Sequence, residues 1–180
     1  MTITRTAIAA SHNKTAGTFW SALCGVQVCA TQTLMVVFAY DVISIVNVSW
    51  GTTALTKAVS VRNTAGVEMT LWHKLADGTS STSAIYVSWA ANVTAKAMFA
   101  IAVSGVNFLD QTVTGISGNV AVISTTGSTA ATRTDNEFLF AIYGGEGISG
   151  TTTSWLQDID TAGLFDATSG GGAATNIRIN

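Results

Sequence analysis

A glycine-rich segment late in the chain has the first spacing that could carry chemistry. Residues 145–150 read GEGISG, a match to the G-x-G-x-x-G phosphate-binding fingerprint. That fingerprint needs a strand before it and a helix after it, because N–H groups at the helix N-terminus hold the pyrophosphate. A strand-like EFLFAIYG precedes it, but TTTSWLQD, rich in β-branched residues, follows where the helix should begin. We therefore interpret the segment as a loop between strands and predict no bound nucleotide or other cofactor.

Two pairs of carboxylates have a spacing that acid–base chemistry could use. Asp158 and Asp160 lie two residues apart, on one face if the segment is a strand, and Asp135 and Glu137 precede another strand-like segment. Glycoside hydrolysis, for example, needs two carboxylates about 5–10 Å apart. Carboxylates at turns are ordinarily solvated, and we interpret all four in that way.

The histidines and serines do not complete a catalytic set. The two histidines are His12 and His73. Alternation places His73, within LWHKLAD, on the strand face of Met69, Leu71 and Leu75, where we expect a partly buried histidine with its hydrogen bonds satisfied. The G-x-S-x-G nucleophile elbow does not occur. We predict that the protein is not an enzyme and has no catalytic residues.

The two cysteines, Cys24 and Cys29, lie within CGVQVC. Five residues apart in an unbroken strand, they would point to opposite faces, which forbids a disulfide between them; a turn at Gly25 would change that. We interpret both as small buried apolar side chains in a reducing cytosol. A metal site is not expected, because no second Cys/His pair accompanies them.

The composition is poor in charge. Only 10% of the 180 residues are charged and 48% are hydrophobic, with mean hydropathy +0.42, whereas about 25% of an ordinary soluble domain is charged. Such a chain either spans a membrane or covers its surface with partners. The longest apolar region is interrupted by Asp41 and Asn47, and the first residues lack a signal-peptide core, so we predict neither a membrane span nor secretion. A net charge of −2 and the lack of a Lys/Arg cluster argue against nucleic acid.

Short strand-like segments separated by Gly, Ser, Thr and Asn run along the whole chain, and no 12-residue window has helical periodicity. This pattern predicts an all-β fold, an antiparallel two-sheet β-sandwich of about 8–10 strands with jelly-roll-like character. The predicted strands are 2–8, 18–23, 33–40, 45–50, 58–62, 67–75, 84–90, 96–104, 119–124, 137–143, 153–159 and 175–179.

Alternation within three segments predicts which faces are buried. In IVNVSW it places Val46, Val48 and Trp50 on one face. In AIYVSWA it opposes Tyr86 and Ser88 to the apolar positions. The run KAMFAIAVSGV is apolar on both faces, as is typical of a central strand that is covered on each side.

The five tryptophans divide into two groups. Trp50, Trp72 and Trp89 lie in strands among aliphatic residues and are predicted to be core. Trp20 and Trp155 lie nearer loops, where an exposed aromatic ring could pack in a protein interface or stack on a sugar. We keep both residues as candidate interface positions.

Both ends of the chain read as short arms. The expected division is an arm at 1–17, a sandwich at 18–168, and a Gly-rich turn with a final strand at 169–180. Alternating apolar positions suit each end to adding a strand to a neighbouring sheet, and the chain contains no proline to protect its edges. We predict a homo-oligomer, most simply a trimer, whose arms pair with another subunit or another protein; the alternative is that both are edge strands of their own sandwich. The candidate interface residues at the two ends are Ile3, Arg5, Ile8, Ile177 and Ile179.

Four segments together resemble a β-sandwich domain that recurs in phage and environmental bacterial proteins. They are VNVSWGTTALT, GVEMTLWHKLA, AIYVSWAANVTAKAMFAIAVSGV and DNEFLFAIYGGEG. The resemblance implies a jelly-roll-like sandwich and carries no catalytic residue. With its arms and charge-poor composition, the whole chain resembles a tailed-phage capsid decoration (cement) protein. That implies the major capsid protein as partner, a place on the virion surface and synthesis in the host cytoplasm. The alternative is a carbohydrate-binding or adhesin module of a phage fibre or cell surface, with a glycan as ligand.

Overall fold

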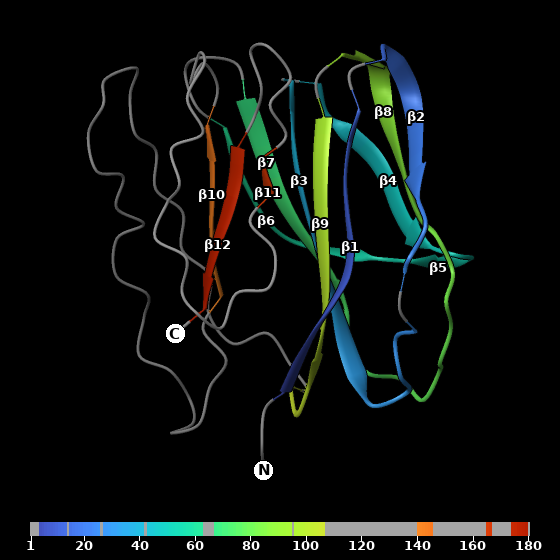
Figure 1. Cartoon of the computed structure of the whole chain (residues 1–180). Coiled ribbons are helices and arrows are strands. Elements are labelled where there is room, and N and C mark those ends of the chain that lie inside the picture. Colours follow the sequence, from blue (N-terminus) through green and yellow to red (C-terminus); the bar gives the residue numbers. More distant parts are fainter. Residues whose placement is uncertain are drawn as a thin grey trace.

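The computed structural model describes residues 4–13, 15–25, 27–41, 43–62, 67–94, 96–106, 140–145, 165–166 and 174–179. Two antiparallel sheets face each other in this part of the chain (Figure 1). The five-stranded sheet has the order β1-β9-β3-β7-β6, formed by β1 (Thr4–Asn13), β9 (Lys96–Ser104), β3 (Gln32–Asp41), β7 (Val67–Lys74) and β6 (Thr56–Arg62). The four-stranded sheet has the order β2-β8-β4-β5, formed by β2 (Gly17–Ala22), β8 (Ile85–Val93), β4 (Ile45–Trp50) and β5 (Thr53–Ala54).

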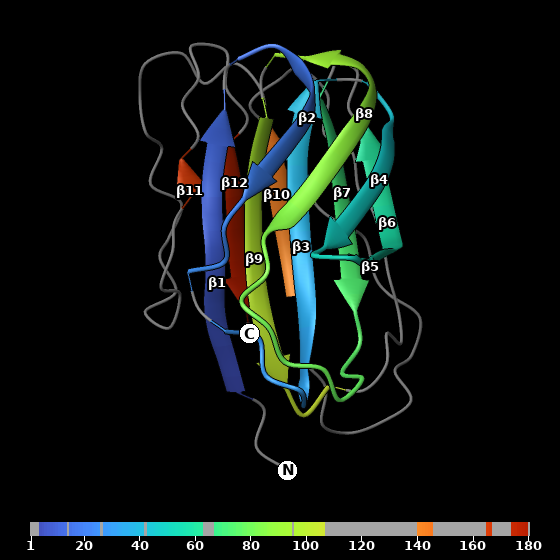
Figure 2. The same cartoon turned by 90° about the vertical axis from the view of Figure 1, so that its right-hand side faces the viewer.

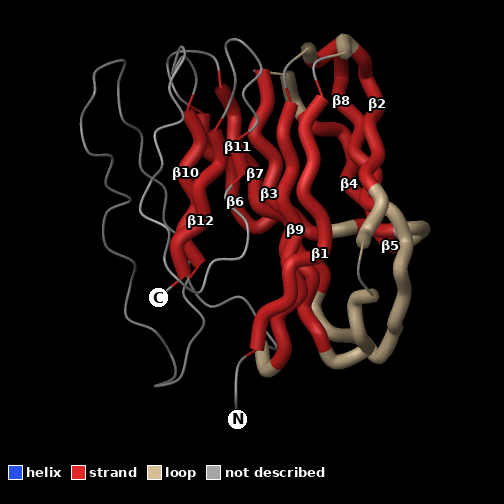
Figure 3. Tube along the Cα trace, viewed as in Figure 1, coloured by secondary structure: helices blue, strands red, loops and turns tan. Residues whose placement is uncertain are grey.

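A smaller sheet of three strands lies against the outside of the five-stranded sheet (Figure 1). It consists of β10 (Phe140–Gly145), β12 (Ala174–Ile179) and β11 (Phe165–Asp166), with β12 in the middle. Strand β10 contacts β7, and β12 contacts β9. The described residues are therefore strands and connecting loops, with no helix among them (Figure 3).

The first strands of the chain alternate between the two sheets of the sandwich. β1 and β3 belong to the five-stranded sheet, whereas β2 and β4 belong to the four-stranded one. The chain crosses back at Leu55, whose N–H donates to the Val48 carbonyl before β6 begins. The resulting orders, β1-β9-β3-β7 facing β2-β8-β4-β5, are jelly-roll-like. The predicted fold class, an all-β antiparallel two-sheet sandwich, is confirmed.

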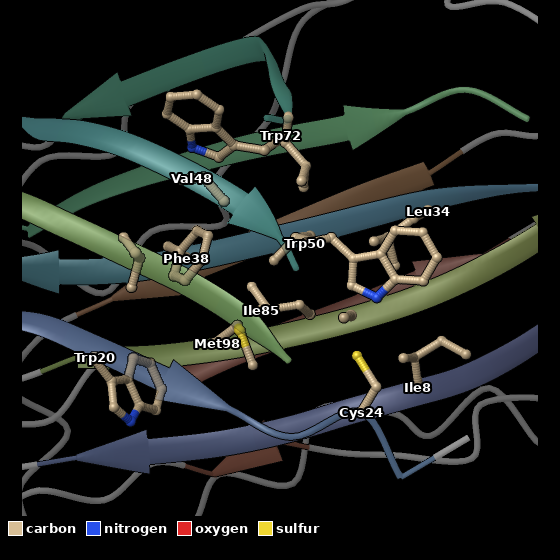
Figure 4. Packing of buried hydrophobic residues seen from close by; sticks show 14 of the residues in the cluster. Ile8, Trp20, Cys24, Leu34, Phe38, Val48, Trp50, Trp72, Ile85 and Met98 are labelled. Carbon is tan, nitrogen blue, oxygen red and sulfur yellow. The ribbon is translucent and has the colours of Figure 1, made fainter. Parts of the chain in front are cut away.

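The main hydrophobic core fills the space between the two sheets. The five-stranded sheet contributes Leu34, Val36 and Phe38, all fully buried, and the four-stranded sheet contributes Val48 and Ile85. Figure 4 shows Leu34, Phe38, Val48 and Ile85 between the ribbons, together with Trp20, Trp50 and Trp72. Trp50, Trp72 and Trp89 are in this core, as predicted, each with at most 8% of its surface exposed.

A lysine stacked on a tryptophan lies at each end of this core. Lys74 pairs with Leu34 at the start of β3, and its Nζ lies 5.2 Å from the Trp50 ring. Lys96 pairs with Tyr40 near the other end of β3, and its Nζ lies 5.6 Å from the Trp89 ring. Both lysines belong to the five-stranded sheet and both rings to the four-stranded sheet, so each cation–π contact connects the two sheets.

The central strands of the five-stranded sheet are buried on both faces. The first eight residues of β9 are all buried, which confirms the prediction for KAMFAIAVSGV. Those that point away from the main core form a second cluster with neighbouring strands, made of Met35, Val37, Leu71, Phe99, Ile101 and Val103. The three-stranded sheet lies on this side of the molecule (Figure 1).

The edge strands carry irregularities in place of the missing prolines. The pairing of β1 with β9 shifts between Ala7 and Ala9, and that of β6 with β7 shifts between Lys57 and Val59. The pairing of β2 with β8 shifts after Gly17. Bulges twist a strand and disfavour the addition of a further strand at an edge. Both edges of the five-stranded sheet and the β2 edge of the four-stranded sheet are therefore poorly suited to pairing with another chain.

The two predicted arms are paired within their own chain wherever the structure describes them. β1 is an edge strand of the five-stranded sheet, and β12 pairs with both β10 and β11. Where they are described, the arms are therefore strands of their own fold, which is the alternative given above. The trimer stays a prediction. Predicted strands 119–124 and 153–159 lie outside the described residues. The other predicted strands are present: the first, 2–8, continues to Asn13 in β1, and the rest have small shifts at their ends.

Candidate functional site

The outer face of the four-stranded sheet is the surface that stands out. No charged residue occurs in β2, β4, β5 or β8. Seen from that side, the described elements leave the face of β2, β8 and β4 open (Figure 2). A soluble domain ordinarily has charged side chains on about a quarter to a third of its surface. A sheet face without any charge is therefore a candidate for contact with a partner.

The large hydrophobic side chains that are exposed in the described part of the chain all lie on or beside this sheet. Phe19 of β2 is 58% exposed and Tyr86 of β8 is 37% exposed. Leu23, just after β2, is 83% exposed, and Val46 of β4 is 66% exposed. The rings of Phe19 and Tyr86 stack with their centroids 6.0 Å apart and an interplanar angle of 29°. We call these four residues the apolar patch.

Val46 is on this surface because β4 bulges. Ile45 pairs with Trp89 and Asn47 with Ser88, so Val46 is an extra residue without a partner in β8. The prediction that Val46 shares the buried face of Val48 and Trp50 is wrong, because the bulge moves it out of the alternation. Val48 and Trp50 are buried as expected.

Small polar side chains surround the apolar patch in two rows across the strands. Phe19, Ser88 and Asn47 are opposite one another in the first row. Ser21, Tyr86 and Ser49 are opposite one another in the second. Hydroxyl and amide groups both donate and accept hydrogen bonds, so these rows suit a neutral partner with mixed donors and acceptors.

Trp20 is buried in the main core. Its side chain is only 8% exposed, so the expectation of an exposed ring at this position is wrong. Trp20 pairs with Val87, and the alternation of β2 directs it inward while Phe19 points outward. The aromatic ring available to a partner is therefore that of the preceding residue.

Four of the remaining candidate interface residues lie in strands that the structure describes. Ile8 is buried in the main core with 3% exposure. The backbone of Arg5 pairs with Val103, and Ile177 and Ile179 pair with Ile142 and Phe140. Ile3 and Trp155 lie outside the described residues, as do the predicted carboxylates Asp135, Glu137, Asp158 and Asp160.

Alternation in the sequence indicates two members of the apolar patch, Tyr86 and Phe19. Alternation in AIYVSWA correctly places Tyr86 and Ser88 opposite the buried positions. The same reasoning applied to GTFWSA allows only one of two adjacent aromatic residues to point inward. The larger ring, that of Trp20, is buried in the core, and the ring of Phe19 is exposed.

Titratable groups elsewhere serve the fold. The Asp77 carboxylate accepts hydrogen bonds from Lys74 Nζ and from the hydroxyl and the N–H of Thr79, which hold its pKa well below the usual range. Burial lowers the pKa of His73, which is half-buried; its Nδ1 has no hydrogen-bond partner, contrary to the expected satisfied histidine. It lies in β7 between Thr56 and Met35.

The two cysteines differ in their surroundings. Cys24 is buried in the main core, where burial raises the pKa of its thiol and the nearby Trp50 partly offsets this. Cys29 is exposed, so the expectation that both cysteines are buried is wrong for Cys29. Both are free thiols.

The described residues contain neither a metal-binding cluster nor a membrane-spanning helix. There, no three His, Cys, Asp or Glu side chains gather closely enough to hold a metal ion. The same residues contain no helix able to cross a membrane. Gly145 is the last residue of β10, and the rest of GEGISG lies outside the described residues.

The chain was compared with protein-family models, curated proteins and solved structures. No family model matches it, and neither does any curated protein or solved structure. What can be stated of its class is the fold, an all-β sandwich of two antiparallel sheets.

Proposed function

We propose that this chain is a structural virion protein, a capsid decoration protein that binds the capsid surface and stabilises it. The observation that carries the proposal is the apolar patch on a sheet face without charge. Contiguous exposed apolar side chains mark contact surfaces, and the centres of protein interfaces are depleted of charge and enriched in aromatic residues. The virion is proposed as the location because the sequence resembles sandwich domains of phage proteins.

The aliphatic members of the patch favour a protein as the partner. Leu23 and Val46 are the most exposed of the four residues and offer a sugar neither a flat ring nor a hydrogen bond. Exposed aliphatic side chains gain most when a protein surface covers them. The rows of serine and asparagine around Tyr86 resemble the Tyr- and Ser-rich composition of binding surfaces that contact proteins.

Binding to capsids is the direct test. Purified protein is mixed with capsids assembled from the major capsid protein encoded in the same genome, and the bound amount is measured by co-sedimentation. We expect binding that saturates at a fixed ratio to the lattice sites, and capsids that withstand more heat when decorated, because a ligand stabilises the state to which it binds. Absence of co-sedimentation at any protein concentration contradicts the proposal.

A carbohydrate-binding module is the second candidate, and the stacked Phe19–Tyr86 pair is the observation that favours it. Two adjacent exposed rings beside Asn47 and Ser88 offer both a stacking surface and hydrogen bonds to a neutral sugar. A glycan array tests it, with Phe19→Ala and Tyr86→Ala as variants. Specific binding that both variants lose identifies the module as a glycan binder, and an array without binding excludes the sugars it displays.

A further inference from the structure

A histidine lies on the outer face of the five-stranded sheet, the side on which the three-stranded sheet packs. His73 pairs with Met35 of β3 and follows Leu71 of its own strand by two positions, and both of these neighbours belong to the second apolar cluster. The flanking Trp72 and Lys74 point to the opposite face, toward the main core. β10 contacts β7, the strand that contains His73 (Figure 1). A titratable group therefore lies on the side where two sheets meet.

The ring nitrogen Nδ1 of His73 is buried and has no hydrogen-bond partner among the residues that the structure describes. A neutral imidazole with its proton on Nε2 suits this position best, because Nδ1 is then an acceptor without a proton. A proton that moves from water to Nδ1 converts it into a donor and places a positive charge beside Met35 and Leu71. The charged form of the ring is therefore the costly one.

The charged groups near His73 in its own sheet lie on the other face. Lys57 and Lys74 stack on tryptophan rings, and the Lys74 ammonium group is paired with the Asp77 carboxylate. Glu68 lies five positions before His73, so alternation directs it to the opposite face of β7, where it accepts a hydrogen bond from a serine of β6. Both carboxylates are engaged there, and neither offers an acceptor to Nδ1 of His73.

The neighbouring strands on the outer side do not supply an acid either. β6 places Thr56 opposite His73. β10 contains Tyr143 as its only titratable residue, and β12, which contacts β9, contains Arg178. Asp166 belongs to β11, which β12 separates from β10. Protonated His73 therefore gains no ion pair from the strands that the structure describes around it.

We infer that His73 makes the contact between these two sheets depend on pH: the neutral ring permits the packing of β10 on β7, and the protonated ring weakens it. Weaker packing exposes the second apolar cluster, made of Met35, Val37, Leu71, Phe99, Ile101 and Val103. The proposed function is not a premise of this inference, because the apolar patch lies on the opposite side of the sandwich.

The direction of the pH dependence follows from the burial of the ring. Burial lowers the pKa of His73 below the ordinary value of 6.5, so the packed state takes up the proton less readily than the opened state does. The packing is therefore at full strength well above pH 6.5 and loses strength as the pH falls below that value. The pKa of Asp77 is held below 3.8, so this carboxylate stays ionised in the range where His73 titrates.

Hydrogen–deuterium exchange of the whole chain, followed by mass spectrometry, tests the inference. Each exchange rate is divided by the intrinsic rate at the same pH. Peptides that cover β10 and β12 should exchange faster than those that cover β8, because a three-stranded sheet that loses its packing opens without unfolding of the sandwich. From about pH 7.5 to about pH 5.5 the protection of β10 and β12 should fall by at least about threefold.

Substitutions at the two histidines separate His73 from a general effect of pH. His73→Gln removes the titratable group and should abolish the fall in protection, and His73→Phe should do the same with an apolar ring that suits Met35 and Leu71. His12→Gln is the matched control: His12 is exposed on β1, and this variant should respond to pH like wild type. Circular dichroism confirms that each variant is folded.

An NMR titration of the imidazole protons gives a readout that needs no substitution at His73. The chain has two histidines, so His12→Gln identifies the His73 signal. We expect a His73 pKa below 6.5, and a loss of protection that begins near pH 6.5 and levels off below that pKa. A His73 pKa at or above 6.5 overturns the inference. So does exchange of β10 and β12 that is as slow as that of β8 at the lower pH, or a pH response that both His73 variants retain.

Discussion

The five-stranded and four-stranded sheets share one core but differ in where charge is found. Every strand of the five-stranded sheet contains at least one charged residue, whereas the four-stranded sheet contains none. Two lysines of the five-stranded sheet even point into the core, where they stack on tryptophans of the other sheet. The charged sheet is the one whose central strands are buried on both faces, and the uncharged sheet leaves one face open.

This distribution of charge is unusual, because charged side chains in soluble proteins ordinarily lie on surfaces exposed to water. Buried charge costs free energy unless it is paired or hydrogen-bonded, and here both inward lysines are. An exposed face without charge lowers solubility and ordinarily persists only when something covers it. The five-stranded sheet therefore holds the strands that are buried on both faces, and the outer face of the four-stranded sheet is the candidate contact surface.

Removing a phenylalanine side chain from each sheet should have very different effects on stability. Phe38→Ala empties a fully buried position of β3 and should lower the free energy of unfolding by about 3–5 kcal/mol. Phe19→Ala removes a side chain that is 58% exposed and should change it by no more than about 0.5 kcal/mol. Urea unfolding followed by tryptophan fluorescence measures both. Equal losses would mean that the open face is part of the folding core.

A second pair of variants compares a buried lysine with an exposed one. Lys96 Nζ donates to the carbonyls of Thr15, at 2.6 Å, and Val93, at 2.8 Å. Lys96→Met keeps the aliphatic stem but takes this donor away from both carbonyls, which should cost about 2–3 kcal/mol. Lys57 is exposed, with Nζ 5.8 Å from the Trp72 ring, and Lys57→Met should cost about 0.5–1 kcal/mol.

The outcome for the lysines decides how far buried charge supports the fold. If Lys96→Met is as stable as wild type, the desolvation of the ammonium group offsets its hydrogen bonds, as happens in some buried ion pairs. Thermal unfolding at constant pH measures the difference. Lys57→Met serves as the control for the loss of one positive charge.

The β-sandwich could be predicted from the sequence because its strands are short, alternate and end at Gly, Ser or Asn. The continuous apolar run of β9 indicated a central strand, which its burial confirms. Strict alternation does not hold at Val46, because the β-bulge there shifts the side chains to the other face of the sheet. Nearness to a loop does not imply exposure at Trp20, because β2 buries this larger ring of the two adjacent ones.

The apolar patch was harder to predict because it is a property of three strands in register. Phe19 and Tyr86 are 67 positions apart by number and meet only through the pairing of β2 with β8. Non-local strand pairing of this kind depends on long-range contacts that local patterning does not encode. The absence of charge from each of the four strands is visible in the sequence, but that they form one sheet is not.

A third pair of variants tests the turn that closes the four-stranded sheet. Gly51 links β4 to β5 with a φ of +58°, and a Cβ there would lie 2.8 Å from Ser83 Oγ. Gly51→Ala should therefore cost about 2 kcal/mol, from backbone strain plus the close contact. Gly78 also has a positive φ, +83°, but nothing lies within 4 Å, so Gly78→Ala should cost only the strain, about 1 kcal/mol. Equal losses, measured by urea unfolding, would show that the contact with Ser83 relaxes freely.

The smallest expected effect concerns Asp77, which follows β7 and pairs with Lys74. Because its hydrogen bonds with Lys74 and Thr79 hold the folded pKa below the ordinary value of 3.8, the carboxylate contributes stability at pH values above 3.8 and loses that contribution as the pH falls below it. Asp77→Asn should remove the part of the acid sensitivity that comes from this carboxylate. Thr79→Val keeps the Lys74 contact but lacks the hydroxyl donor, so its acid sensitivity should lie between those of the wild type and Asp77→Asn. Urea midpoints from about pH 5 down to about pH 2 measure it, and only the difference from wild type is assigned to Asp77, since other carboxylates titrate in the same range. Lys74 is buried but Asp77 is 43% exposed, so solvent screening weakens the pair. Parallel midpoints for all three proteins would mean that the Asp77 carboxylate near the end of β7 does not stabilise the five-stranded sheet.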